Sequence, residues 1–163
     1  MSKKDLLNGK KVLVVDDELD ILELVQEQLP MCTVSKASSF TEAKQMLETN
    51  YYDLAILDIM GVDGYKLLEI ANRQKVTAVM LTAHALSPGN VVKSYKGGAA
   101  SYLPKEKLAE IQDFLEDIFE AKKTGKHAWW NWYDRLSSFF EKKFGPNWRE
   151  EDKDFWKNFG HYV

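Results

Sequence analysis

The chain has 163 residues, which is room for one domain of ordinary size or for one domain with a short appendage. Hydrophobic residues make up 45% and charged residues 29%, and this balance excludes wholesale disorder. The net charge of -3 gives no strong attraction to nucleic acid or to an anionic membrane. The single cysteine excludes an internal disulfide framework, and no apolar run approaches the roughly 20 residues that span a bilayer. We therefore expect a cytoplasmic protein.

The two parts of the chain differ in composition. All five tryptophans lie within residues 123–163. Before them, Lys122 to Lys126 reads Lys-Lys-Thr-Gly-Lys, which is typical of a helix end with basic residues in its last turn and a glycine just past it. We therefore divide the chain into a domain over residues 1–122, a linker over 123–126 and an aromatic-rich helical extension over 127–163.

The first part alternates short apolar runs with helical periodicities. Strands are expected over residues 12–15, 33–35, 54–57, 76–81 and 99–103. Each is followed by a helical pattern, with Asp17 and Ser39 expected to cap the first two helices and Pro88 to begin the fourth. Five strand–helix units in a row predict an α/β fold with a parallel sheet between helices.

Polar side chains follow the ends of four of these strands. Asp16 and Asp17 follow the first strand, Asp58 the third, Thr82 the fourth and Lys105 the fifth. In open parallel sheets, ligands bind beyond the carboxyl ends of the strands, so these residues are candidates for one site. Three aspartates close together repel one another unless they are protonated or neutralised. A hard divalent cation such as Mg²⁺ fits oxygen ligands, and the absence of His and Cys among these residues argues against zinc.

Several motifs at these strand ends together resemble a known family. They are Val-Leu-Val-Val-Asp-Asp-Glu at 12–18, Ile-Leu-Asp-Ile-Met at 56–60, Asp63-Gly64, Leu81-Thr82-Ala83 and Tyr102-Leu103-Pro104-Lys105. Over residues 10 to 122 the chain resembles the receiver domain of bacterial two-component response regulators. The resemblance implies a flavodoxin-like doubly wound sheet with strand order 2-1-3-4-5. It does not extend to the C-terminal extension.

The resemblance also implies a chemistry. Asp58 would accept a phosphoryl group from a histidine kinase or a phosphotransfer protein. Asp16 and Asp17 would hold Mg²⁺ together with Asp58, and the main-chain carbonyl of Met60 would complete the protein ligands. Such a protein catalyses only its own phosphotransfer and dephosphorylation, so it is not a conventional enzyme.

The same resemblance implies a switch. Thr82 would hydrogen-bond the phosphoryl group, Lys105 would pair with it, and Tyr102 would change rotamer when Thr82 moves. The face made by the fourth helix, the fifth strand and the fifth helix would then be the output surface toward a downstream protein. Adding about two negative charges at one aspartate is enough to bias a two-state element.

The sequence departs from the family pattern in two places. The loop from Asp58 to Gly64 lacks two residues, including the proline that the family has there, so Gly61 and Gly64 are expected to supply a tight backbone. Glu106 follows Lys105 where the family often has a cis proline, and the sequence leaves open which isomer this bond adopts. The alternative function is therefore a pseudo-receiver, a constitutive protein-binding module that is not phosphorylated.

The extension has aromatic residues at helical spacing from Trp129 to Phe144, a break at 145–147 and a second short helical pattern over 152–159. A helix pair of this size cannot bury so many rings alone. It could fold back on the first domain, form a protein-binding or homodimer surface, bind DNA or lie on a membrane. Few basic residues and no helix-turn-helix pattern disfavour nucleic acid, and the acidic run at 150–152 disfavours a membrane.

Overall fold

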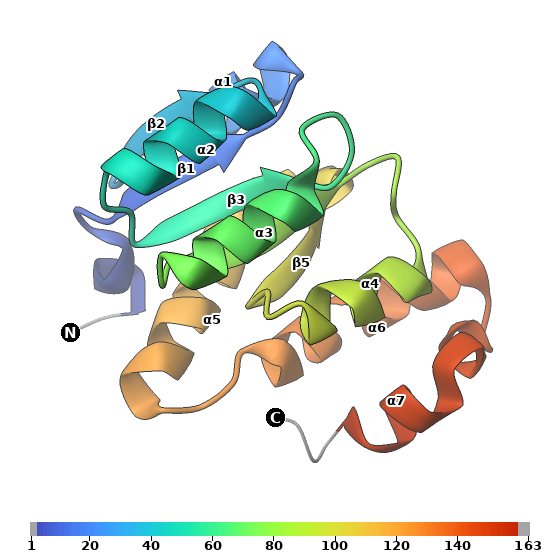
Figure 1. Cartoon of the computed structure of the whole chain (residues 1–163). Helices are drawn as coiled ribbons and strands as arrows, with labels where there is room; N and C mark the ends of the chain where they lie inside the picture. Colours follow the sequence, from blue (N-terminus) through green and yellow to red (C-terminus); the bar gives the residue numbers. More distant parts are fainter. Residues whose placement is uncertain (1–2, 160–163) are drawn as a thin grey trace.

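The computed structural model describes residues 3–159 and contains one five-stranded parallel sheet (Figure 1). The strand order is β2-β1-β3-β4-β5, which confirms the predicted fold class. The strands are β1 Lys11–Val15, β2 Thr33–Ala37, β3 Leu54–Asp58, β4 Thr77–Thr82 and β5 Ser101–Pro104. All neighbouring strands pair in parallel, so their carboxyl ends lie at one edge of the sheet.

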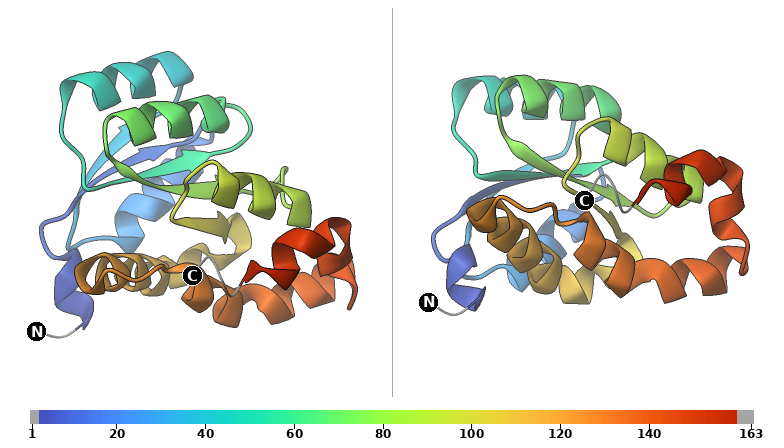
Figure 2. Two further views of the ribbon diagram at one scale, coloured as in Figure 1. Left: turned by 60° about the horizontal axis from the view of Figure 1, so that its bottom comes forward. Right: turned by 90° about the horizontal axis from the view of Figure 1, so that it is seen from below.

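Helices cover both faces of the sheet. They are α1 Leu19–Gln28, α2 Phe40–Thr49, α3 Gly64–Arg73, α4 Pro88–Lys96 and α5 Ile111–Thr124, with a 3-10 segment η2 over Lys105–Glu110 before α5. Helices α2, α3 and α4 lie on one face, and α1 and α5 lie on the other (Figure 2). The inner strands β1, β3 and β4 are buried, as their continuous apolar runs predict.

The helix starts follow local capping chemistry, with one correction. The Ser39 hydroxyl accepts from the Glu42 N–H, and Ser87 accepts from the Asn90 N–H in front of α4. Asp17 does not cap α1, because that helix begins at Leu19 and the nearest side-chain bond runs from the Glu18 N–H to Asp16 Oδ1, at 2.9 Å. The Asp17 carboxylate is thereby left for the loop after β3.

A short N-terminal turn was absent from the sequence prediction. The 3-10 segment η1, Lys3–Leu7, packs against α5 and buries Leu7 completely. The Leu7 carbonyl accepts from Cys32 Sγ at 3.3 Å. Only two adjacent leucines mark this turn, which is too little for a periodicity to be visible.

The C-terminal extension folds back on the sheet domain. It consists of α6 Trp129–Phe144, η3 Trp148–Asp152 and α7 Lys153–Lys157, here called the C-terminal helices (Figure 2). Gly125 ends α5 with a φ of 72°, and Gly145 follows α6 with a φ of 87°. Helix α6 contacts β5 and α5, and η3 contacts α4. The face of α4, β5 and α5, predicted above as the output surface, is therefore contacted by the C-terminal helices.

The division into a domain, a linker and an extension stays a prediction. The structure gives the bounds of the two helices on either side of the predicted linker. Helix α5 runs through Thr124, and residues 125–128 connect it to α6. Within residues 3–159, none of the helices combines the length and the apolar character that crossing a bilayer requires.

Candidate functional site

The carboxyl edge of the sheet brings the predicted residues together. Asp16 follows β1, Asp58 ends β3, Thr82 ends β4 and Lys105 follows β5, and we call these four residues the strand-end site. Lys105 Nζ lies 2.8 Å from Asp16 Oδ2 and 3.6 Å from Asp58 Oδ1. Asp16 and Lys105 are 89 positions apart in the sequence. They lie in one charge cluster because parallel strands end side by side.

Asp16 is the most deeply buried member of the site. It is completely buried, and its Oδ1 accepts the Glu18 N–H. Its Oδ2 is close to Lys105 Nζ, but that contact lacks hydrogen-bond geometry. Burial raises the pKa of Asp16, while Lys105 acts in the opposite direction. A buried carboxylate oxygen without a hydrogen bond can still accept a cation.

Asp58 lies beside it with 4% of its surface exposed. Burial, followed by repulsion from Asp16, raises the pKa of Asp58 to about 7, although Lys105 opposes this shift. Gly64 packs against the main chain of Asp58, since a Cβ on Gly64 would come within 2.1 Å of the Asp58 carbonyl oxygen. The shortened loop therefore depends on Gly64 to pass beneath Asp58.

The acidic side chains fit a hard divalent cation. Asp16, Asp17 and Glu18 each offer a carboxylate oxygen, and these oxygens lie within 4.8 Å of one another. Mg²⁺ takes such oxygens as ligands and keeps several waters, so a partial protein shell is sufficient. Glu18 was not a predicted ligand, although its place directly after the Asp16-Asp17 pair was the signal for it.

The loop after β3 runs beside the same carboxylates. Gly61 has a φ of 86°, and a Cβ there would come within 2.7 Å of both Asp17 carboxylate oxygens. This close approach requires glycine, because other residues rarely adopt this φ and would displace Asp17. The neighbouring Met60 has an exposed side chain, and its carbonyl as a metal ligand stays a prediction.

Lys105 is the positive charge of the site. Its side chain is 8% exposed and also lies 3.2 Å from Glu18 Oε1. Burial alone would lower the pKa of Lys105, but Asp16, Asp58 and Glu18 outweigh it and the pKa is raised. All peptide bonds in the described part of the chain are trans, including Lys105–Glu106.

The two residues predicted to form a switch, Thr82 and Tyr102, both bond to the loop between β4 and α4. Thr82 is buried, and its Oγ1 accepts the Ala85 N–H at 2.9 Å. Tyr102 is fully buried, with its hydroxyl donating to the Ala85 carbonyl at 3.0 Å and accepting the Ser87 N–H at 3.3 Å. Thr82 and Tyr102 therefore both bond to Ala85 in this loop, Thr82 to its N–H and Tyr102 to its carbonyl.

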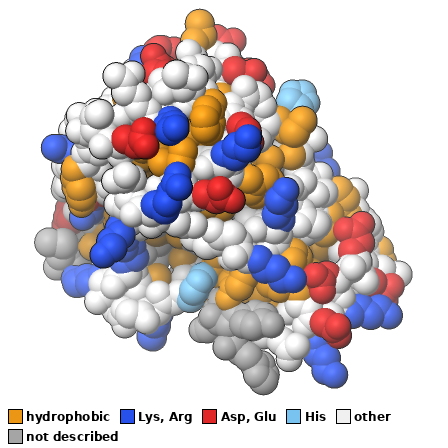
Figure 3. Space-filling view, in the orientation of Figure 1, with side chains coloured by type: hydrophobic (Ala, Val, Ile, Leu, Met, Phe, Trp, Pro, Cys, Tyr) orange, Lys and Arg blue, Asp and Glu red, His pale blue; other side chains and the backbone are white. Residues whose placement is uncertain are grey.

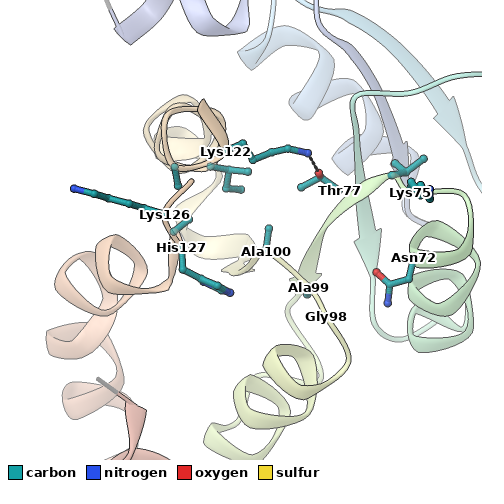
Figure 4. A pocket seen from close by; sticks show the side chains of 13 residues that line it. Asn72, Lys75, Thr77, Gly98, Ala99, Ala100, Lys122, Lys126 and His127 are labelled. Carbon is teal, nitrogen blue, oxygen red and sulfur yellow. Dashed lines mark hydrogen bonds between the residues drawn. The ribbon is translucent and has the colours of Figure 1, made fainter. Parts of the chain in front are cut away.

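A separate cavity of about 310 Å³ lies near the amino end of β4, away from the carboxyl ends of the strands (Figure 4). Its lining includes Asn72, Thr77 and His127. Lys122 Nζ donates to Thr77 Oγ1, and Lys126 extends away from β4 (Figure 4). Its lining contains no carboxylate, so this cavity is distinct from the strand-end site.

The raised pKa of Asp58 leads to a stability prediction. In the unfolded chain this carboxyl titrates near its ordinary value of about 3.9, so the folded state binds the proton more tightly. The stability from this group is complete below that value and is lost as the pH rises to about 7. We expect Asp58→Asn to stabilise the metal-free protein at pH 8 by on the order of 1–3 kcal/mol, and to lose this advantage at low pH.

Thermal unfolding in a chelator at several pH values measures this effect. Asp63→Asn is the matched control, because Asp63 is an exposed carboxylate whose φ of 55° asparagine also tolerates. Added Mg²⁺ should shrink the difference between the wild type and Asp58→Asn. An Asp58→Asn advantage that does not grow from pH 5 to pH 8 would contradict the burial argument.

Known proteins are similar to this chain in sequence. Residues 12–116 match the family described as the response regulator receiver domain, and residues 117–163 lie outside that match. Over 127 residues the chain is 32% identical to two-component response regulator ARR10 of Arabidopsis thaliana, covering 73% of this chain and 23% of that protein. Over 117 residues it is 37% identical to ARR18 of the same plant, covering 68% of this chain and 18% of that protein. The chain thus spans about a fifth of the length of these curated relatives.

A solved structure agrees with the fold. The receiver domain of the Francisella response regulator 1452 superposes with a TM-score of 0.62 at 26% identity, covering 70% of this chain and 99% of that one. The strand order, the acidic cluster after β1 and the family match over most of the sheet domain lead to one conclusion: the chain belongs to the response regulator receiver domain family.

Proposed function

We propose that this receiver domain is a phosphorylation switch in which Asp58 accepts a phosphoryl group from a histidine kinase or a phosphotransfer protein. The observation that carries the proposal is the position of Lys105, whose Nζ lies 2.8 Å from Asp16 Oδ2 and 3.6 Å from Asp58 Oδ1. A nucleophilic carboxylate beside a buried ammonium and an acidic cluster suits the charge neutralisation that phosphoryl transfer needs.

The chemistry assigns a role to each residue. An Asp58 carboxylate oxygen attacks phosphorus as the bond from phosphorus to the donor nitrogen breaks, and the donor imidazole takes a proton from solvent. Lys105 pairs with the phosphoryl oxygens, and the Thr82 hydroxyl donates to one of them. Mg²⁺ would be held by Asp16 and Asp17 with Asp58 and the Met60 carbonyl, and when bound it neutralises oxygen charge at phosphorus.

Family membership implies signalling partners such as a histidine kinase. A downstream target protein and a homodimer belong to the proposal. Nucleic acid is not among the proposed partners, and one face of the molecule agrees with this. The face drawn in Figure 3 carries basic and acidic side chains intermixed, without the one-sign stripe that nucleic-acid binding uses.

The alternative is a pseudo-receiver that binds partners without being phosphorylated. One observation favours it: Lys105 lies nearer to Asp16 and Glu18 than to Asp58. If those two carboxylates hold the ammonium permanently, it would not follow the phosphoryl group.

Acetyl phosphate with Mg²⁺ separates the two functions. We expect the intact mass of the full chain to rise by one phosphoryl group, in the wild type and in Asp63→Asn, but not in Asp58→Asn. Omitting Mg²⁺ should also prevent the increase. An unchanged mass under saturating donor and Mg²⁺ would favour the pseudo-receiver.

A further inference from the structure

Strand β5 is an edge strand, and helix α6 covers that edge. β5 pairs only with β4 in the sheet order, so its outer carbonyls need partners from elsewhere. Trp132 Nε1 donates to the Tyr102 carbonyl at 2.7 Å, and Trp129 Nε1 donates to the Ala99 carbonyl at 3.0 Å. Both tryptophans are essentially fully buried. Helix α6 thus binds one main-chain carbonyl of β5, at Tyr102, and one just before the strand, at Ala99.

An ion pair and an aromatic contact fix the same helix. Arg135 donates through Nε and Nη2 to the two carboxylate oxygens of Asp117, at 2.6 and 3.2 Å, and Asp117 is only 3% exposed on α5. The Phe140 ring lies 5.6 Å from that of Trp132 and 6.3 Å from that of Tyr102. A two-point contact of this kind gives α6 one defined position on the receiver.

The other end of the extension contacts α4. The Phe155 ring lies 5.2 Å from Tyr95 in an edge arrangement, and Lys96 Nζ lies 3.9 Å from Asp152 Oδ2. Trp156 shares a small cleft with Pro88 in the first turn of α4. A movement at the start of α4 would therefore reach α7.

Tyr102 connects these contacts to the strand-end site. Its hydroxyl bonds to Ala85 and Ser87 in the β4–α4 loop, and its carbonyl accepts from Trp132. Thr82 bonds to the Ala85 N–H of the same loop. The Thr82 hydroxyl can donate to a phosphoryl group on Asp58, and a shift of its oxygen toward that group would lengthen the bond that it accepts from the Ala85 N–H.

We propose that the C-terminal helices are the output element of this receiver: they are docked on α4, β5 and α5 while Asp58 is unmodified, and they loosen when Asp58 is phosphorylated. The inference rests on the proposed function. The helices are docked while Thr82 and Tyr102 both bond to Ala85, and a shift of this loop would reach them through Tyr102, whose carbonyl binds Trp132, and through Pro88, which lies beside Trp156. Coupling of this kind is reciprocal: weaker docking must also favour the phosphorylated form.

The chain contains its own probe, because all five tryptophans lie in the C-terminal helices. We expect acetyl phosphate with Mg²⁺ to raise acrylamide quenching of tryptophan about twofold and to speed amide exchange over residues 129–144 by about tenfold, within the usual range of coupling energies. The intact mass of the same sample gives the phosphorylated fraction. Tyr102→Phe lacks the hydroxyl bonds to Ala85 and Ser87. For each phosphorylated molecule, its increases in quenching and in amide exchange should be less than half of those in the wild type.

The reciprocal arm uses beryllofluoride with Mg²⁺ as a stable mimic of the phosphoryl group. Trp132→Phe keeps a ring but loses the bond to the Tyr102 carbonyl, so beryllofluoride should bind about 5-fold more tightly than to the wild type. Trp130→Phe is the matched control, because Trp130 is 44% exposed and its ring contacts are within the extension. It should bind beryllofluoride like the wild type.

The outcomes are separable. A full mass increase with unchanged quenching and exchange, or equal beryllofluoride affinity in Trp132→Phe and Trp130→Phe, would overturn the output element while leaving the phosphorylation switch intact. No mass increase and no beryllofluoride binding would overturn both, since the second rests on the first.

Discussion

Replacing Lys105 by methionine is expected to slow phosphorylation of Asp58 by about 100-fold or more. The ammonium lies between Asp16 and Asp58, and it is the positive side chain that reaches both. Methionine fills a similar volume without charge, so the phosphoryl oxygens lose a preorganised partner inside a mostly buried site. The rate of mass increase with acetyl phosphate and saturating Mg²⁺ measures the effect.

Lys107→Met is the matched control for this experiment. Lys107 lies two positions away in the same 3-10 segment and pairs with the exposed Glu110 at 3.7 Å, so its loss should leave the rate nearly unchanged. Unfolding curves in Mg²⁺ should show both variants folded. A Lys105→Met rate within about threefold of the wild-type rate would show that the ammonium has no part in the transfer, as in the pseudo-receiver.

The strand-end site could be predicted from the sequence because its geometry follows from topology. Once five strand–helix units were recognised, the first polar residues after the strands had to meet at one edge. Asp16, Asp58 and Lys105 lie together as expected. The predicted Asp17 cap was wrong, because α1 begins at Leu19 after Glu18, which has no side-chain cap, and Asp16 accepts the N–H of Glu18 instead.

The docking of the extension could be predicted only in part. The sequence predicted an aromatic helical stripe of Trp129, Trp132 or Tyr133, Leu136, Phe139 or Phe140, and Phe144. The structure buries Trp129, Trp132, Leu136 and Phe140 and leaves Phe144 exposed. Their partner could not be read from the sequence, since the indole N–H groups bind main-chain carbonyls, which carry no sequence signal. Asp117 and Arg135 likewise look like ordinary surface charges until α5 and α6 are placed side by side.

This docking changes what the family resemblance implies for output. A receiver with a bare α4–β5–α5 face would present it directly to a partner, but here Tyr102 is fully buried and Trp132 occupies its carbonyl. A partner that uses this face must therefore displace the C-terminal helices. In the proposed switch, the energetic cost of this displacement limits how strongly phosphorylation can control output, so the strength of the docking is the quantity to measure.

Trp129→Ala measures that strength. Trp129 is completely buried, its indole caps the Ala99 carbonyl, and its ring lies 5.3 Å from Tyr95 and 5.2 Å from Trp132. Removing a buried aromatic of this size costs about 3–5 kcal/mol. Since these contacts join the extension to the receiver, we expect tryptophan emission to report loosening at a lower urea concentration than the far-ultraviolet circular dichroism of the sheet domain.

The control is Trp130→Ala, the adjacent residue on the same helix. Its ring is 44% exposed and meets Tyr133 and Phe159 within the extension, so its loss should cost less than about 1 kcal/mol and leave the two transitions coincident. Equal losses in the two variants would mean that α6 is held by the extension's own packing rather than by the sheet domain. Separated transitions only in Trp129→Ala would place docking energy on the contacts of Trp129 with Tyr95 of α4 and with the Ala99 carbonyl just before β5.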